Sequence, residues 1–145
     1  MLITSLFVIL GLMLLTAGAE ILVRGSVALS LRLSVTPLVI GLTVVAISTS
    51  LPELATSVMA SVKGEADVAF GNVIGSNILN ILCVLGVTAL ISPFNIQGLR
   101  PMDLIVLLGS AVLILPLLWR GYTLNRWEGA TLLAGYIAYL YSLVS

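Results

Sequence analysis

The chain has 145 residues, of which 60% are hydrophobic and 8% are charged, and its formal net charge is zero. A soluble domain of ordinary composition has roughly 25% charged residues, so the composition excludes that class and predicts an integral membrane protein in a lipid bilayer. The zero net charge, without basic blocks, argues against nucleic acid as a partner. The sequence has one cysteine and no histidine, which excludes a disulfide framework and the common His-ligated metal sites.

Five segments of the chain are apolar and long enough to predict membrane spans, since about 20 helical residues cross the hydrocarbon core. The first is followed by a short connector, Gly25 to Ser34, which is compatible with an interfacial helix. We therefore predict an all-α fold in which residues 1–145 form a single multi-pass membrane domain. The predicted spans are Leu2 to Val23, Thr36 to Val62, Val68 to Ser92, Met102 to Trp119 and Trp127 to Leu143.

The second span contains a polar cluster that reads Ser48-Thr49-Ser50-Leu51-Pro52-Glu53. A carboxylic acid at the centre of a hydrocarbon core costs roughly 3 kcal/mol on insertion scales, so Glu53 is a functional-site candidate by default. Pro52 has no N–H for the Ser48 carbonyl, and its ring disfavours helical geometry in the preceding residue. We therefore expect the helix to break at Pro52 near mid-membrane.

A break at this position gathers oxygen atoms of the kind that bind hard cations. The free Ser48 carbonyl would lie beside the Thr49 and Ser50 hydroxyls and the Glu53 carboxylate. Ca²⁺ takes about 6 to 8 such oxygen ligands. The cluster therefore predicts part of a calcium site.

The third span carries a second polar cluster, from Gly71 to Asn80, which is expected to interrupt that helix as well. Asn72, Ser76 and Asn80 follow one another at spacings of four, which places them on one helix face. Gly71 and Gly75 form a pair of small residues that lets another backbone approach closely. The short connector Lys63-Gly64-Glu65-Ala66 makes the second and third spans antiparallel neighbours, so their polar clusters should lie at similar depth.

The last two spans read mainly as scaffold. Asp103 stands near the start of the fourth span, where we expect it to be solvated or to act as a charge at the helix start. Arg120 and Arg126 lie in the connector between these spans.

The order Thr49-Ser50-Leu51-Pro52-Glu53 followed by Gly71-Asn72-Val73-Ile74-Gly75-Ser76-Asn77-Ile78 resembles the signature repeat of the cation/calcium exchanger superfamily, which includes the sodium/calcium exchangers and their bacterial relatives. The resemblance implies a secondary transporter with no cofactor, and a place in a prokaryotic plasma (inner) membrane. It also implies that two repeats of opposite orientation build cation sites at the bilayer midplane. Carried over to this chain, the ligands are Thr49, Ser50, Glu53, Ser76 and Asn80, with structural roles at the site for Pro52, Gly71, Asn72, Gly75 and Asn77.

The chain departs from the family pattern in two respects. Ser48 stands where a glycine is usual. Family members usually carry ten spans, whereas this chain supplies one repeat, so it is expected to be one half of an inverted-repeat exchanger fold. Lys63, Arg120 and Arg126 fall on one predicted side and three arginines (Arg24, Arg32 and Arg100) on the other, so the positive-inside rule gives almost no orientation. An antiparallel homodimer of dual topology is the leading assembly, and one half of a split or truncated exchanger is the rival.

Four functions can be compared with the chemistry of the two polar clusters. The leading hypothesis is an antiporter that exchanges Ca²⁺ for Na⁺ or H⁺ by alternating access, because broken helices in an inverted repeat suit that mechanism. A dual-topology cation channel would use the same oxygens, and a membrane scaffold without transport would leave Glu53 unexplained. An intramembrane hydrolase is disfavoured because no histidine is present and the serines near Glu53 have no evident base.

Overall fold

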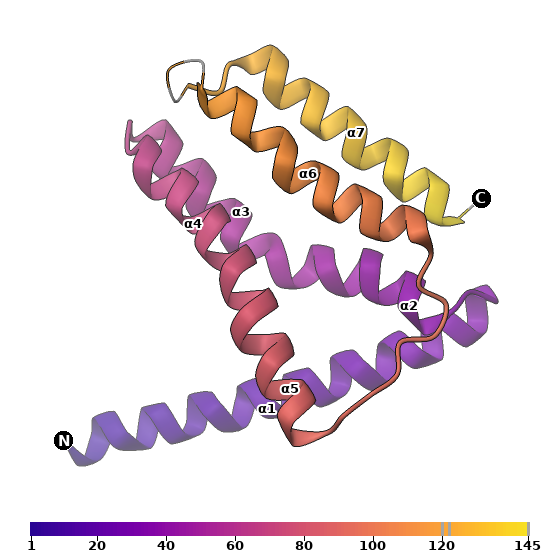
Figure 1. Cartoon of the computed structure of the whole chain (residues 1–145). Helices are drawn as coiled ribbons and strands as arrows, with labels where there is room; N and C mark the ends of the chain where they lie inside the picture. Colours follow the sequence, from indigo (N-terminus) through magenta and orange to yellow (C-terminus); the bar gives the residue numbers. More distant parts are fainter. Residues whose placement is uncertain (120, 122, 145) are drawn as a thin grey trace. The chain divides into compact units, whose positions relative to one another are not determined.

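The computed structural model describes residues 1–119, 121 and 123–144, and the regular elements within them are all helical (Figure 1), which confirms the all-α prediction. Arg120, which was assigned above to one predicted side of the membrane, lies outside the described residues. In chain order the elements are α1 (Leu2–Leu33), α2 (Pro37–Ile40), the π-helix η1 (Gly41–Val45), α3 (Ala46–Val62), α4 (Ala66–Ile78), the π-helix η2 (Leu79–Val84), α5 (Leu85–Ile91), α6 (Pro101–Trp119) and α7 (Arg126–Val144).

Within the described residues, three continuous helical stretches are long and apolar enough to cross a membrane: Ile3–Leu33, Pro37–Val62 and Ala66–Ile91. The second and third agree closely with the predicted spans. In α6 the apolar stretch Pro101–Pro116 is shorter, and α7 occupies the position predicted for the last span. The chain is therefore an integral membrane protein by composition and helix length, while the count of five spans stays a prediction.

The first helix is longer than the sequence predicted. α1 runs without interruption through 32 residues, so the predicted connector at Gly25 is wrong. At 1.5 Å per residue this helix is about 48 Å long, well beyond a hydrocarbon core of about 30 Å. The helix ends after Leu33, where Ser34 takes a φ of 54° and the Val35 amide donates to the Ser30 carbonyl at 3.0 Å.

The predicted break at Pro52 is also wrong, because α3 continues through this proline from Ala46 to Val62. In α3 the Ser48 hydroxyl donates to the Val44 carbonyl at 2.6 Å, and the Thr49 hydroxyl donates to the Val45 carbonyl at 2.9 Å. The irregular geometry lies upstream instead, in the π-helix η1, and in the third span it lies in η2.

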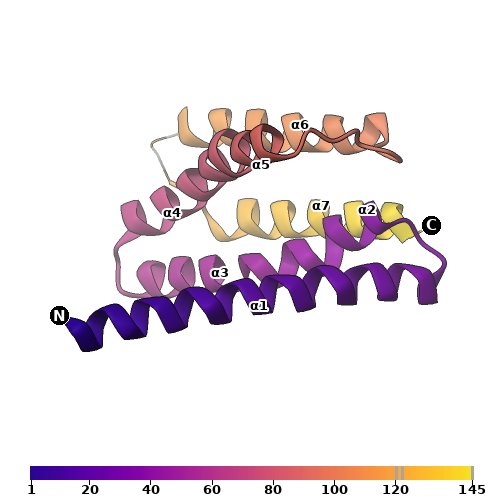
Figure 2. The same cartoon turned by 90° about the horizontal axis from the view of Figure 1, so that it is seen from below.

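Contacts within the chain define two compact units, and the first contains residues 1–22 and 41–96. In this unit α3 and α4 form an antiparallel hairpin, which Figures 1 and 2 both show. The turn has the Schellman pattern: the Glu65 amide donates to the Ala60 carbonyl at 2.9 Å, and the Gly64 amide donates to the Ser61 carbonyl at 3.1 Å. Gly64 has a φ of 82°, a conformation in which glycine carries no steric cost. The predicted antiparallel pairing is confirmed.

The second unit contains residues 23–40 and the chain from Gln97 onward, including α6 and α7. The second of these helices begins with a reciprocal cap. In α7 the Asn125 side-chain oxygen accepts the amides of Trp127 and Glu128, each at 3.0 Å, while Glu128 accepts the Asn125 amide at 2.8 Å. This arrangement is a capping box, which satisfies amides that a helix start leaves without partners.

At the start of α6, four residues form what we call the Asp103 network: Arg100, Asp103, Tyr139 and Ser142. The Asp103 carboxylate accepts the Arg100 amide at 3.0 Å, the Arg100 guanidinium at 3.0 Å and the Tyr139 hydroxyl at 3.2 Å. Arg100 also donates to the Ser142 carbonyl at 2.6 Å, which joins the start of α6 to the end of α7. The side-chain hydrogen bond to Asp103 raises the pKa of the Arg100 guanidinium, so this group stays charged.

The prediction that Asp103 is a helix-start charge is correct in position, but its expected solvation is wrong. Its side chain is only 4% exposed, because Arg100 and Tyr139 cover it from two directions. A buried carboxylate with partners is costly to disturb, since removing the charge leaves the guanidinium and the hydroxyl without their acceptor.

We expect Asp103→Asn to lower the thermal unfolding temperature of the detergent-solubilised protein by several degrees, because an amide cannot replace the carboxylate as acceptor for all of these donors. Ser110→Ala is the matched control in α6, where the exposed Ser110 hydroxyl donates only to the Leu107 carbonyl of its own helix. Equal melting temperatures for Asp103→Asn and the wild type would contradict a stabilising role for the network.

Candidate functional site

The predicted ligands of the second span lie on α3, in its first half. Ser48, Thr49 and Ser50 are exposed in the chain. The Ser48 and Thr49 hydroxyls donate their protons to carbonyls of their own helix. A hydroxyl that donates its proton still has lone pairs on its oxygen, so both side chains can also bind a cation.

Glu53 lies one turn beyond Thr49 and is half-buried. One of its carboxylate oxygens, Oε2, is buried and has no hydrogen-bond partner among the described residues. Buried polar atoms in folded proteins nearly always have a partner, and leaving a carboxylate oxygen without one is costly. This oxygen is therefore a buried acceptor that still lacks a positively charged or hydrogen-bonding ligand.

On the third span, Gly71, Asn72, Gly75, Ser76 and Asn77 all lie on α4. The Ser76 hydroxyl and the Asn77 amide both donate to the Val73 carbonyl, at 3.1 and 3.0 Å. Asn72 and Ser76 are half-buried, as expected for two residues that share a face.

Asn80 differs from the other two polar residues of this face. It lies in η2, which begins at Leu79, and it is exposed. A π-helix forms i→i+5 hydrogen bonds, so a spacing of four residues no longer returns to the same face. Asn80 therefore stands at the point where the α-helical repeat that carries Asn72 and Ser76 changes to a π-helix.

The structure brings the two polar clusters together at Glu53 and Asn72. The Asn72 amide nitrogen donates to the Glu53 carbonyl at 3.1 Å and to the Ser57 hydroxyl at 2.9 Å. Ser57 in turn donates to the Ala69 carbonyl at 3.3 Å. Sequence reasoning missed Ser57, although its spacing of four residues from Glu53 places it on the same face of α3.

Gly71 and Gly75 do not mediate a close helix approach within the described chain. A Cβ atom built at either position meets no atom of the chain within 4 Å. The described residues also form no group of three His, Cys, Asp or Glu side chains that could hold a metal ion. Within this hairpin, the Glu53 backbone carbonyl is bonded to Asn72, and its carboxylate has a buried oxygen without a partner among the described residues.

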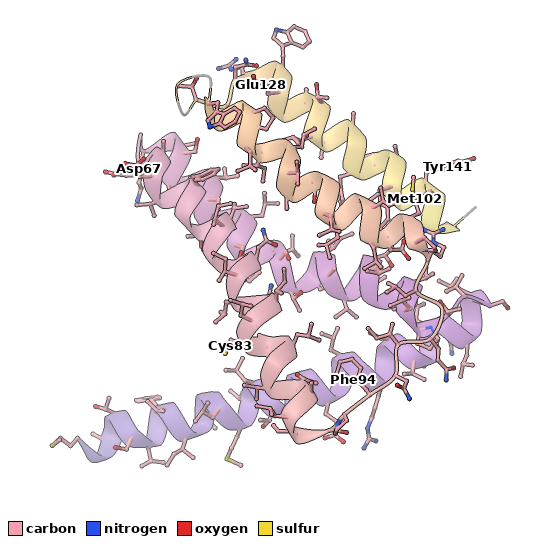
Figure 3. All side chains as sticks on the ribbon, in the orientation of Figure 1. Asp67, Cys83, Phe94, Met102, Glu128 and Tyr141 are labelled. Carbon is pink, nitrogen blue, oxygen red and sulfur yellow. The ribbon has the colours of Figure 1, made fainter. Side chains whose placement is uncertain are left out.

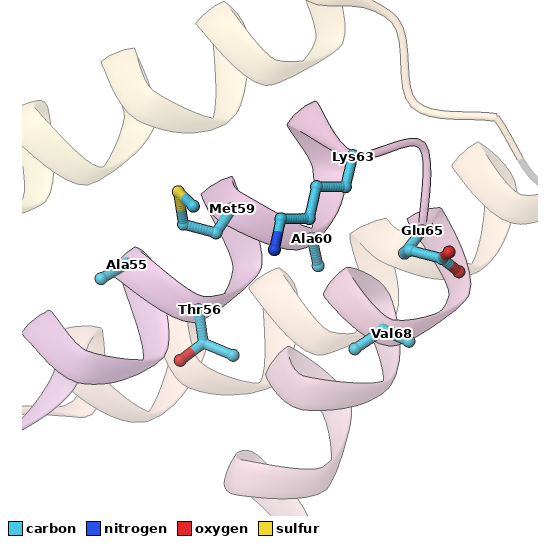
Figure 4. A pocket seen from close by; sticks show the side chains of 7 residues that line it. All are labelled: Ala55, Thr56, Met59, Ala60, Lys63, Glu65 and Val68. Atoms are coloured by element: carbon cyan, nitrogen blue, oxygen red, sulfur yellow. The ribbon is translucent and has the colours of Figure 1, made fainter.

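A hollow of about 500 Å³ lies near the turn of the α3–α4 hairpin (Figure 4). In this view the Lys63 side chain runs back along α3 toward Met59. None of the predicted ligands lines this hollow, so it is distinct from the polar cluster around Glu53. Its lining residues are Ala55, Thr56, Met59, Ala60, Lys63, Glu65 and Val68.

A polar hairpin of this kind, built from two apolar helices, can be compared with known proteins. The family model for sodium/calcium exchanger proteins matches residues 3–144. The chain belongs to the sodium/calcium exchanger family. This family membership confirms the resemblance on which the predicted ligand set depends.

Three similar proteins come from bacteria and an archaeon. "Putative antiporter CaxA" of Alkalimonas amylolytica is 44% identical over 145 residues, which cover 97% of this chain and 46% of the relative. Sodium/calcium exchanger MaX1 of Methanosarcina acetivorans is 42% identical over 109 residues, covering 74% of this chain and 31% of the relative. Inner membrane protein YrbG of Escherichia coli is 38% identical over 133 residues, covering 90% and 41%.

The chain spans less than half of the length of each of these relatives. No solved structure matches the chain significantly. The family is therefore shown by sequence similarity and not by similarity to a solved structure.

Pro52 provides a test of the backbone ligand predicted at Ser48. Although α3 is continuous, Pro52 still has no N–H to donate to the Ser48 carbonyl. We expect Pro52→Ala to supply this donor, to raise the thermal unfolding temperature, and to lower the affinity for Ca²⁺ because the carbonyl is then occupied. Proline in a helix interior costs about 3 kcal/mol relative to alanine, which is the upper limit of the gain.

Pro116→Ala in α6 is the matched control, since Pro116 also lies inside a helix but far along the chain from the polar clusters. It should raise stability without changing Ca²⁺ affinity. Unchanged Ca²⁺ affinity in Pro52→Ala would exclude the Ser48 carbonyl as a ligand.

Proposed function

We propose that this chain forms half of an antiporter that moves Ca²⁺ across a prokaryotic plasma membrane in exchange for Na⁺ or H⁺ by alternating access. The observation that carries the proposal is the buried Glu53 Oε2 atom, which has no partner in a helix of a sodium/calcium exchanger family member. The neighbouring oxygen ligands are the Thr49, Ser50 and Ser76 side chains, with Asn80 and the Ser48 carbonyl completing the proposed set.

The chemistry of this set favours Ca²⁺ over smaller divalent cations. Hydroxyl, amide, carbonyl and carboxylate oxygens are all hard ligands, and Ca²⁺ accepts six to eight of them in a flexible geometry. Mg²⁺ demands a nearly ideal octahedron and gives up its water reluctantly. The name of one similar protein, sodium/calcium exchanger MaX1, agrees with this choice of cargo.

A complete site needs more negative charge than one hairpin supplies. One Glu53 carboxylate leaves a net positive charge on bound Ca²⁺, whereas two carboxylates neutralise it. We propose that a second exchanger half of opposite orientation faces the hairpin, so that the ion site lies at the interface of two inverted copies near the bilayer midplane. The open faces of Gly71 and Gly75 leave room for that close approach.

The second half has two candidate sources. A second copy of this chain, inserted in the opposite orientation, would form an antiparallel homodimer with two Glu53 and two Asn80 side chains. A different exchanger half, separate or within a longer chain, is the rival, and it is favoured by the length of the similar proteins. In the homodimer, the two carboxylates balance one Ca²⁺ or two monovalent cations, so the exchange would be close to electroneutral.

Transport by the chain alone can be measured as ⁴⁵Ca²⁺ uptake into liposomes that contain the purified protein, driven by an outward Na⁺ or H⁺ gradient. We expect Glu53→Gln to abolish uptake, because it removes the charge that binds Ca²⁺. Glu65→Gln, in the exposed connector, is the matched control and should keep the wild-type rate. The gradient that drives uptake identifies the counter-ion.

Two results would reject this proposal. Ca²⁺ uptake that survives in Glu53→Gln would remove Glu53 from the mechanism. Electrical currents far above transporter rates would assign the same oxygens to a cation channel instead. Uptake that appears only after a second exchanger half is added would retain the function and reject the homodimer.

The orientation of the chain distinguishes the two assemblies directly. Cys83, the one cysteine in the sequence, is exposed and points away from the ribbon of η2 (Figure 3), so it must first be replaced by serine. On this background, Ala66→Cys and Gln97→Cys place single thiols in exposed positions at opposite ends of the third span. In a dual-topology homodimer, a membrane-impermeant maleimide should label each thiol from both sides of the membrane.

Labelling of each thiol from one side only, and from opposite sides for the two variants, would exclude dual topology. The partner would then be a different exchanger half with the opposite orientation.

A further inference from the structure

A polar bridge between α3 and α4 lies directly beside Glu53. The Asn72 amide nitrogen has two hydrogens, and it has two acceptors on the opposite helix, the Glu53 carbonyl at 3.1 Å and the Ser57 hydroxyl at 2.9 Å. Ser57 completes the bridge by donating to the Ala69 carbonyl of α4 at 3.3 Å. Asn72 and Ser57 are both half-buried, so water competes poorly for these bonds.

We propose that Asn72 is a positioning residue for Glu53, which it holds through the hydrogen bonds that its amide nitrogen donates to the Glu53 carbonyl and the Ser57 hydroxyl. This inference rests on the proposed function for its effect on transport, whereas the bridge itself is independent of that function. Asn72 acts on the residue that carries the charge, and Ser57 acts on Asn72.

The use of lone pairs separates the positioning groups from the ligands. In an α-helix the Glu53 carbonyl accepts the amide of the residue four positions later, and Asn72 supplies a second donor. The two lone pairs of this carbonyl are then occupied. The Ser57 hydroxyl donates to the Ala69 carbonyl and accepts from Asn72. The side-chain oxygen Oε2 of Glu53 is left for the cation, since it has no partner among the described residues.

A second asparagine on the same helix shows that this arrangement is specific to position 72. Asn77 lies five residues further along α4, is exposed, and donates to the Val73 carbonyl of its own helix at 3.0 Å. The same side chain at position 72 reaches across to α3. The difference lies in the face of α4 that each residue occupies, and position 72 faces the hairpin partner.

Loss of the bridge should weaken Ca²⁺ binding more than it slows transport. Without Asn72, α3 can slide or rotate against α4, so Glu53 and Ser76 must be brought into place by the cation itself. Removing a group that orients a metal ligand typically costs about 10- to 100-fold in affinity. We therefore expect Asn72→Leu to raise the Ca²⁺ concentration for half-maximal uptake by about tenfold or more, with a smaller change in the maximal rate.

Three further variants sharpen the test. Ser57→Ala removes one of the two acceptors of Asn72 and should produce a smaller rise in the half-saturating concentration. Thr56→Val is its matched control on α3, because the exposed Thr56 hydroxyl donates to the Pro52 carbonyl of its own helix at 2.9 Å. Asn72→Gln retains both amide hydrogens and should restore part of the affinity lost in Asn72→Leu.

The bridge is also tested without transport, by thermal unfolding of the purified protein in detergent. Asn72→Leu and Ser57→Ala should each lower the unfolding temperature, and the double variant should lose less than the sum of the two, because both remove the same hydrogen bond. Thr56→Val combined with Asn72→Leu should be additive.

The transport measurement and the unfolding measurement test separate parts of the proposal. Additive losses for Asn72→Leu and Ser57→Ala would overturn the bridge, whatever the protein transports. Non-additive losses together with an unchanged half-saturating Ca²⁺ concentration in Asn72→Leu would overturn the positioning role while leaving the bridge and the transport function intact. If the wild-type protein takes up no Ca²⁺ while the decreases in unfolding temperature are non-additive, the proposed function is rejected and the bridge is retained.

Discussion

The high cost of a carboxylate oxygen without a partner in apolar surroundings governs the structure around Glu53. Most polar side chains near it meet their needs within the hairpin: Ser48 and Thr49 donate to their own helix, and Asn72 and Ser57 use one another. Glu53 Oε2 does not. Among the buried side-chain atoms of the described residues, this oxygen is the one left without a hydrogen-bond partner, and a positively charged ligand is the natural complement to it.

Positions on α4 differ in whether they are hydrogen-bonded to the neighbouring helix or lie beside open space. The face of α4 that carries Asn72 is joined to α3, whereas Gly71 and Gly75 lie beside open space. In a membrane, small residues of this kind allow backbones to approach closely, and no aqueous driving force is needed to bring the helices together. Among the described residues, this hairpin thus combines a face of α4 that is hydrogen-bonded to α3 with glycine positions that remain open to close approach.

The sequence predicted the helical hairpin and the proximity of Glu53 to the second polar cluster because apolar length and a short connector determine both. It failed at Pro52, because a proline inside a helix does not always interrupt it: α3 continues through Pro52, and the irregular backbone lies upstream in η1. It also missed the solvent exclusion around Asp103, since Arg100 and Tyr139 are distant from each other in the chain and no local pattern pairs them. The predicted ligand roles of Ser48, Thr49, Ser50 and Glu53 follow from the chemistry of their cluster, whereas those of Ser76 and Asn80 come from the family resemblance.

The hydrogen bonds that join the helices differ greatly in sequence separation. The bonds between α3 and α4 join residues that are 12, 15 and 19 positions apart, whereas those of the Asp103 network join residues 36 and 42 apart. Closing a short loop costs less chain entropy and happens sooner than closing a long one. During synthesis, the hydrogen bonds between α3 and α4 can therefore form as soon as α4 has entered the membrane. The bond from Arg100 to Ser142 can form only after the end of α7 has been made. The part of the chain that carries Glu53 can thus be fixed before α6 and α7 are joined to each other.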